Sequence, residues 1–168
     1  MTLFNIRWSA LGLLVLGAAA HAQGGPARVV YVAPERLYSE TKQAKAADAR
    51  IAAEFSGRAK ANAEMLARVR KLSDKFEADE TALAEPERTR RRRELFDLDA
   101  ETRRKEIAYR DDLQHRKNAE RELITARAHA LIGRIAEQDK IDVVLFRDVL
   151  WARPGVDITD NIIKQLDK

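Results

Sequence analysis

The residues of this chain that could do chemistry do not form a catalytic or metal-binding set. Beyond the first 22 residues the histidines are His115 and His129, fourteen positions apart, which would separate them by about 21 Å along one helix. The chain has no cysteine and no phosphate-cradling glycine loop, and its serines lack a nearby base: Ser39, Ser56 and Ser73. We therefore predict that the protein is not an enzyme and uses no cofactor or metal.

The clearest chemical signal is a run of arginines just after Pro86. Cations near the N-terminus of a helix oppose the helix dipole, so helix stability alone does not favour them there. At 100° per residue they would encircle the helix as a cationic collar. Two interpretations stay open: a solvated, repulsive tip, or a contact for anionic lipid, lipopolysaccharide or acidic proteins. The collar residues are Arg88, Arg90, Arg91, Arg92 and Arg93.

Pro86 also divides a long helix-prone stretch close to its middle. The stretch runs from about residue 41 to about residue 138, and Ala84-Glu85-Pro86-Glu87 has the proline and the acids that favour a helix start. The sequence predicts two antiparallel helices of similar length, about 44 residues and about 65 Å each. They would form an arm over residues 41–140 with its tip near Pro86.

Each predicted helix carries an apolar stripe that would form a seam with the other helix. The first stripe alternates spacings of four and three from residue 51 to residue 83, and the second follows an eleven-residue repeat from residue 98 to residue 135. Groups that disfavour burial interrupt the first stripe: Arg58, Asn62 and Asp79.

Two interpretations of this seam remain open. The stripes could simply hold the helices together, or a thin, interrupted seam could leave some apolar side chains accessible to a binding partner. In the second case the contact would be diffuse. The candidate contacts are Met65, Val69, Leu72, Phe76, Leu95 and Leu98.

The segments that flank the arm predict a small β body at its base. Runs of β-branched and aromatic residues occur at 28–32, 141–146 and 149–151 and favour strands. A body of residues 28–40 and 141–168, about 45 residues, is smaller than most domains that fold alone without disulfides, metals or oligomerisation. Oligomerisation is the route left to a chain without cysteine. The body residues concerned are Val30, Val32, Val143, Leu145, Val149 and Trp151.

Residues 1–22 have the pattern of a cleaved secretory signal peptide. Arg7 supplies the positive charge, residues 11–20 are an apolar run, and Ala20-His21-Ala22 supplies small residues at the cleavage site. The run is too short to span a bilayer, so we expect a soluble exported chain, residues 23–168, that folds as one domain. Without Arg7 the excess of Lys+Arg over Asp+Glu falls from +4 to +3, which describes a solvated surface rather than a polybasic tail.

The C-terminal stretch from Ile141 to Asp160 resembles the OmpH/Skp family of periplasmic chaperones. The resemblance rests on an apolar strand, a charged two-residue turn, an aromatic-containing strand and then Pro154-Gly155-Val156-Asp157-Ile158-Thr159-Asp160 opening a last helix. Glu35-Arg36-Leu37-Tyr38 after the first strand fits the same family. Departures from the family pattern occur at Ala33-Pro34 and at Phe146.

The resemblance implies an α+β fold: a small β body carrying a long antiparallel helical hairpin, assembled as a homotrimer whose arms enclose a cavity. It implies a periplasmic holdase that binds unfolded outer-membrane proteins without ATP and prevents their aggregation. Two other functions stay open, a structural coiled-coil spacer of the envelope and a basic anion- or lipid-binding protein. No nucleic-acid partner is expected, because the arm lacks the interleaved aromatics that base stacking uses.

Overall fold

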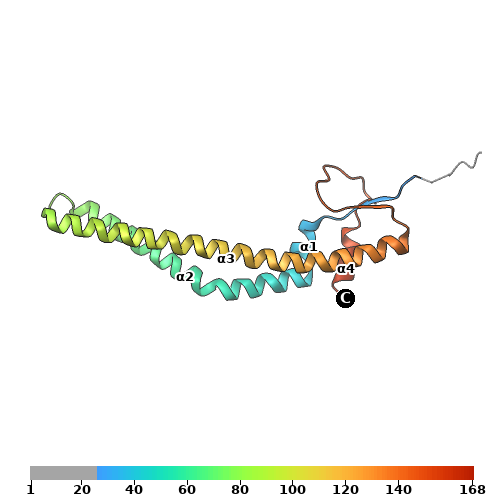
Figure 1. The fold of residues 1–168 in the computed structure, drawn as a ribbon, viewed down its shortest axis with the longest axis horizontal. Helices are drawn as coiled ribbons and strands as arrows, with labels where there is room; N and C mark the ends of the chain where they lie inside the picture. The colour runs from blue at the N-terminus through green and yellow to red at the C-terminus, as the bar shows by residue number, and fades with distance from the viewer. Residues whose placement is uncertain (1–25) are drawn as a thin grey trace, which may run out of the picture.

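A computed structural model describes residues 26–168, so the predicted signal peptide lies outside the described residues. A long helical hairpin projects from a small mixed body that contains both ends of the described chain (Figure 1). In chain order the elements are β1 (Val29–Tyr31), α1 (Pro34–Glu40), α2 (Lys42–Asp79), α3 (Glu85–Asp139), β2 (Val143–Leu145) and α4 (Thr159–Leu166). The predicted long antiparallel helical hairpin is present, and the fold is mostly helical with one small two-stranded sheet.

The hairpin turns close to the predicted proline. α2 ends at Asp79, and α3 begins at Glu85 with Pro86 in its first turn, where a missing N–H costs nothing. The first backbone bond of α3 runs from the Arg88 N–H to the carbonyl of Ala84, at 3.0 Å. The turn of the hairpin therefore lies between Asp79 and Glu85, directly before Pro86.

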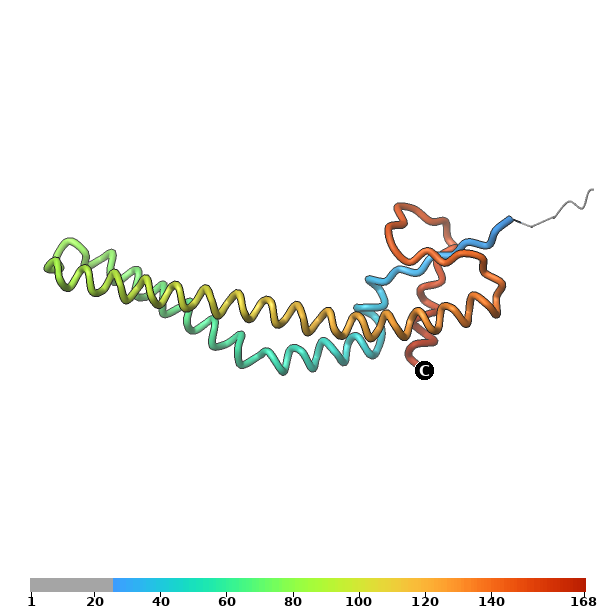
Figure 2. Tube along the Cα trace, in the orientation of Figure 1, coloured from blue at the N-terminus to red at the C-terminus, as the bar shows by residue number. Residues whose placement is uncertain are grey.

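The two arm helices are not of similar length, as the sequence had suggested. α2 has 38 residues and α3 has 55, and α3 continues past the start of α2 into the body (Figure 2). Its apolar positions stay on one face up to Ile135, and Lys140 then ends the helix in the left-handed conformation, φ 53°. Because nothing interrupts α3 before Lys140, the same helix belongs to both the arm and the body.

A short joint at Thr41 separates α1 from α2. The Thr41 side chain donates to the carbonyl of Leu37 at 2.8 Å and accepts from the N–H of Ala44 at 3.1 Å. It therefore satisfies the end of one helix and the start of the next while it is itself almost completely buried. The sequence analysis did not predict α1 as a helix, although Pro34 stands at its first turn.

The sheet is smaller than predicted. β1 and β2 pair in parallel, with Val30 opposite Val144, and β1 bonds on its other side to residues 156–158 through Tyr31. The predicted strand at 149–151 is wrong: these residues form a loop that begins beside Asp148, φ 57°, and ends near Gly155, φ 90°. Strand propensity alone does not make a strand where no neighbouring strand offers hydrogen bonds.

The core lies where α3 crosses α1 and α4. More than half of its residues come from the last part of α3, in the range 41–140 that the sequence predicts as the arm. The buried residues are Val32, Leu37, Ala44, Ile124, Ala128, Leu131, Ile132, Ile135 and Ile162.

Asp157 and Thr159 join α4 to the first strand. The Asp157 carboxylate accepts from the backbone N–H of Thr159 at 2.8 Å, so Asp157 caps the start of α4. The Thr159 hydroxyl is fully buried and accepts from the N–H of Ala33 at 2.8 Å. The family-like motif around Ile158 therefore closes the body.

Candidate functional site: the helical arm and the body surface

The α2–α3 seam follows the predicted stripes. Near the body it is tight, because Ile51, Phe55 and Ile124 are buried. Towards the tip it becomes thinner, and the side chains there are only half-buried. All six candidate contacts belong to this distal part: Met65, Val69, Leu72, Phe76, Leu95 and Leu98. They pack between the helices and keep only part of their surface open to a partner.

The polar interruptions of the seam have defined positions. The Arg58 guanidinium lies over the rings of Phe55 and Tyr109, 5.6 and 5.8 Å from their centroids, and donates to Asp112 at 2.7 Å. Cation–π contact lets a charged residue occupy a seam position while its guanidinium group stays accessible to water. Asn62 leaves its side-chain N–H group buried without a partner among the described residues, which marks a weak point of the seam.

Glu120, which lies within the second predicted stripe, forms a cross-helix ionic cluster. Its buried carboxylate accepts from Arg116 at 2.8 Å and from Arg50 of α2 at 3.3 Å, and Arg116 also reaches Glu54. The hydrogen bond with Arg116, helped by Arg50, lowers the pKa of Glu120 although burial opposes the shift. This cluster joins α2 and α3 just outside the core.

The five arginines lie at the arm tip as predicted, but they do not form a bare cationic collar. Acids of the first turn of α3 and the end of α2 accept from four of them: Arg88 pairs with Glu85, Arg90 and Arg91 with Glu87, Arg91 also with Asp79, and Arg92 with Glu80. Hydrogen bonds from Arg90 and Arg91 lower the pKa of Glu87 to about 2. Within the described residues only Arg93 of the collar forms no ion pair.

The tip as a whole carries no net charge. Residues 79–94 contain five arginines and five acids, the acids being Asp79, Glu80, Glu85, Glu87 and Glu94. Sequence reasoning missed this balance because pairing across the turn depends on the register of the two helices. The acids also offset the unfavourable placement of cations at the start of α3.

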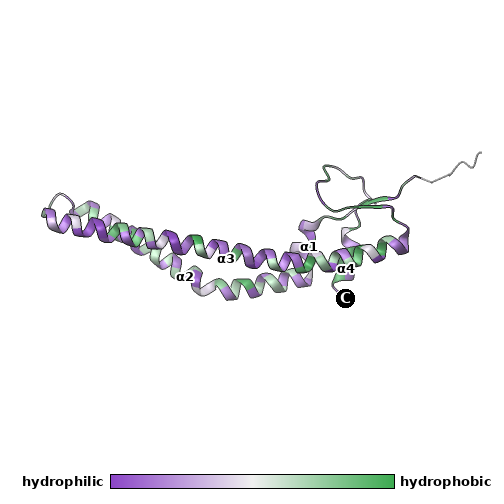
Figure 3. Ribbon diagram, viewed as in Figure 1, coloured by the Kyte–Doolittle hydropathy of each residue, from purple (hydrophilic) through white to green (hydrophobic). Residues whose placement is uncertain are grey.

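The most exposed apolar side chains of the arm are not in the predicted stripes. Phe96 is 71% exposed, Ile107 59%, Leu123 58% and Leu66 36%. A signal for three of them was present in the sequence, because Leu66, Ile107 and Leu123 are large apolar residues next to a stripe position rather than on it. Hydropathy along the arm is accordingly mixed, as Figure 3 shows.

The body has an apolar surface of its own. Leu150 is fully exposed and Trp151 is 79% exposed on the loop after β2, and Val29, Val143 and Leu145 are also exposed. Val30 and Val32, by contrast, are buried inside the protomer. β2 has no second strand partner among residues 26–168, so one sheet edge is open beside these side chains.

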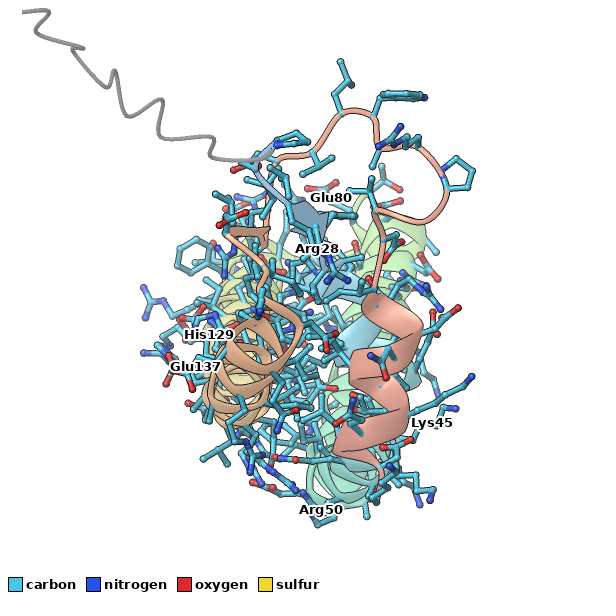
Figure 4. All side chains as sticks on the ribbon, turned by 90° about the vertical axis from the view of Figure 1, so that its right-hand side faces the viewer. Arg28, Lys45, Arg50, Glu80, His129 and Glu137 are labelled. Carbon is cyan, nitrogen blue, oxygen red and sulfur yellow. The ribbon has the colours of Figure 1, made fainter. Side chains whose placement is uncertain are left out.

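A wide groove of about 950 Å³ lies between α1 and α3, where His129 and Arg121 line it together with Tyr38. His129 packs edge-on against Phe146, with ring centroids 4.8 Å apart. The end-on view shows Lys45 and Glu137 on opposite outer sides of the paired helices (Figure 4).

Over the described residues, no cluster of three or more histidine, cysteine or acidic side chains could hold a metal ion. Within the same residues, none of the helices has the length and apolar character needed to cross a membrane.

Comparisons with known proteins agree with this architecture. A crystal structure of a candidate outer membrane chaperone (OmpH-like) from Caulobacter crescentus CB15 superposes with a TM-score of 0.61 at 20% identity, over 85% of this chain and 86% of that one. At that identity the likeness shows the fold. No match was found among curated proteins. The sequence model of the family described as outer membrane protein (OmpH-like) matches residues 28–166, and the chain therefore belongs to the OmpH-like family.

Proposed function

We propose that the protein is an ATP-independent periplasmic holdase that binds unfolded outer-membrane proteins and prevents their aggregation. The observation that carries the proposal is the arm. It is a 38- and 55-residue helical hairpin whose distal part has a thin seam and exposed apolar side chains, with Phe96 71% and Ile107 59% exposed. Exposed apolar surface of this kind marks a site that contacts apolar segments of another chain.

The proposed mechanism is shielding by many weak contacts. Unfolded β-barrel chains expose alternating apolar residues and unpaired strand edges, which aggregate in water. Apolar arm side chains surrounded by charged ones can cover such segments reversibly, and a modest excess of arm cations would speed the capture of acidic chains. Nothing in this scheme requires a nucleotide.

We also propose that the chain works as a homotrimer with a shared body and three projecting arms. Support comes from the exposed apolar surface of the body, where Leu150 and Trp151 stand beside the open edge of β2. Exposed apolar loops and open strand edges are surfaces that a second copy commonly covers. Three arms around one body would enclose a cavity that a single arm cannot provide.

A test of the holding function is dilution of a urea-unfolded outer-membrane barrel into buffer, with and without a threefold excess of the protein, followed by light scattering in the absence of nucleotide. Suppressed scattering supports the proposal. Equal scattering in both samples overturns it and favours the envelope spacer.

Contact of the arm tip with anionic lipid is a separate proposal, which Arg93 supports and the charge balance of the tip opposes. Binding to anionic liposomes that falls with added salt and is lost in Arg93→Gln would support it. Absence of such binding in the unmodified protein would leave the tip as a solvated surface.

A further inference from the structure

Three exposed apolar side chains of the distal arm remain unexplained by the packing of the protomer. Leu66 lies on α2, and Phe96 and Ile107 lie on α3. Among the described residues, no aromatic ring and no cation packs against the ring of Phe96. The rings of Phe55 and Phe76, by contrast, are each covered by an arginine. A phenylalanine that is 71% exposed on a rigid helix keeps most of its apolar surface in water.

The three side chains share one side of the hairpin. Leu66, Phe96 and Ile107 each follow a seam position by one residue, Met65, Leu95 and Glu106 respectively. A step of one residue rotates a side chain by 100°, and in two antiparallel helices that step leads away from the seam towards the same side. Leu123 precedes the seam residue Ile124 instead, which places it on the opposite side.

The helix register brings Leu66 and Ile107 to similar levels along the arm. Arg58 faces Asp112 and Asp79 faces Arg91, so Leu66 is level with about residue 104 of α3. Ile107 is then a few ångströms from that level along the axis. Phe96 lies about 16 Å from Ile107 towards the tip. We call Leu66, Phe96 and Ile107 the distal apolar face.

The charges around this face are mainly positive. Arg70, one turn after Leu66, forms no ion pair within the described chain, and Arg103 and Arg110 flank Ile107 while each holds an acid of its own helix, Asp99 and Glu106. Cations beside an apolar face favour a partner that combines apolar and acidic residues.

We propose that the distal apolar face binds an extended apolar segment of an unfolded polypeptide, with acidic residues beside its apolar ones. The inference rests on the proposed holding function and assigns its main contact to residues outside the seam. About five residues of extended chain span 16 Å, and their alternate side chains point to one side. One such segment could therefore touch Phe96 and Ile107 together.

A second copy of this chain is a poorer occupant of the same face. Three side chains offer on the order of a few hundred Å² of apolar surface, whereas a stable protein–protein interface buries about 1,200 Å² or more. A small apolar contact suits weak, repeated binding to a flexible segment. It does not suit a permanent interface between folded arms.

The test compares a triple variant with a matched control. Leu66→Gln, Phe96→Gln and Ile107→Gln are combined in one protein, and Leu123→Gln, also an exposed apolar residue of α3, serves as the control. Glutamine is a good helix former and these side chains are exposed, so circular dichroism and thermal unfolding should match the unmodified protein.

The measurement is the affinity for a urea-unfolded outer-membrane barrel, together with suppression of its aggregation. We expect the triple variant to bind about tenfold more weakly and Leu123→Gln to bind normally. If the triple variant binds as well as the unmodified protein, or the control loses as much, the inference is wrong while the holding function stands. If the unmodified protein does not bind at all, the holding function itself fails.

A photo-crosslinking residue gives a second readout that does not depend on affinity. Placed at position 96 or 107, it should form adducts with the unfolded barrel, and placed at position 123 it should form few. Equal adducts at all three positions would overturn the assignment of this face.

Discussion

Phe55 of α2 meets Tyr109 of α3 edge to face, with ring centroids 5.9 Å apart and an interplanar angle of 67°. The contact lies where the arm leaves the body, between the buried seam and the thinner distal seam. Phe55 is buried and Tyr109 is half-buried. Because Arg58 covers both rings, this point combines apolar packing with a cation–π contact.

Phe55→Ala should destabilise the proximal arm by about 3 kcal/mol, since it removes a buried aromatic ring and leaves a cavity. Urea unfolding followed by circular dichroism at 222 nm measures the change. Combined with Tyr109→Ala in a double-mutant cycle, the two rings should show a coupling of about 1 kcal/mol. A coupling indistinguishable from zero would mean that the rings pack independently.

The arm was predictable because its signals are local. The periodicity that placed Ile51, Phe55 and Ile124 in the seam depends only on residues a few positions apart, and Pro86 marks a helix start by its own chemistry. Seam position and tip position followed directly from these features.

The predictions that failed concern the packing of elements that are far apart in the sequence. Periodicity shows that Leu131 and Ile135 face something apolar, but it does not show that α1 and α4 cover them instead of α2. The run at 149–151 has strand propensity without a neighbour to pair with. The ion pairs of Arg91 and Arg92 required the register across the turn, and the sequence pattern leaves that register open by several residues.

Glu120→Gln should reduce stability at neutral pH by about 1 to 2 kcal/mol, because the amide cannot replace the charge-assisted bonds to Arg116 and Arg50. The folded-state pKa of Glu120 is lowered, so its contribution is present above its ordinary value of 4.5 and is lost as the pH falls through the folded-state pKa. Thermal unfolding from pH 7 to pH 3 measures this.

The difference in melting temperature between the unmodified protein and Glu120→Gln is the quantity to follow, because other acids such as Glu40, Glu87 and Glu101 also have lowered pKa values. That difference should shrink towards low pH. A difference that stays constant would show that Glu120 contributes through packing rather than charge.

Arg91→Gln should loosen the arm tip without changing global stability noticeably. The Arg91 guanidinium joins Asp79 at the end of α2 to Glu87 in the first turn of α3, at 2.9 Å in both cases, and exposed ion pairs of this kind act locally. Hydrogen exchange should become faster in residues 79–91. Arg93→Gln is the matched control, since it removes an arginine of the same collar that has no ion pair, and it should leave exchange unchanged.

If three chains share one body, the assembled protein should have a defined mass, and its tryptophan fluorescence should change when it dissociates. Light scattering on a chain of residues 23–168 should give three times the mass of one chain. A stable, folded monomer at micromolar concentration would contradict the shared body. Trp151 is the only tryptophan in that chain, and within one protomer it is 79% exposed on the loop after β2, so its environment reports directly on assembly.

In the assembled protein the Trp151 indole should be covered and emit at shorter wavelength, whereas dilution to the dissociated state should move its emission to longer wavelength.

Trp151→Ala combined with Leu150→Ala removes the two most exposed apolar groups of the body and should shift assembly to higher concentration while helicity is retained. The double change Phe96→Ala and Ile107→Ala on the arm is the control, because it removes a similar apolar area away from the body and should leave the mass unaltered. If emission from Trp151 does not change over a dilution series in which the mass falls, the loop is not part of the subunit interface, and the open edge of β2 has to be covered by some other contact.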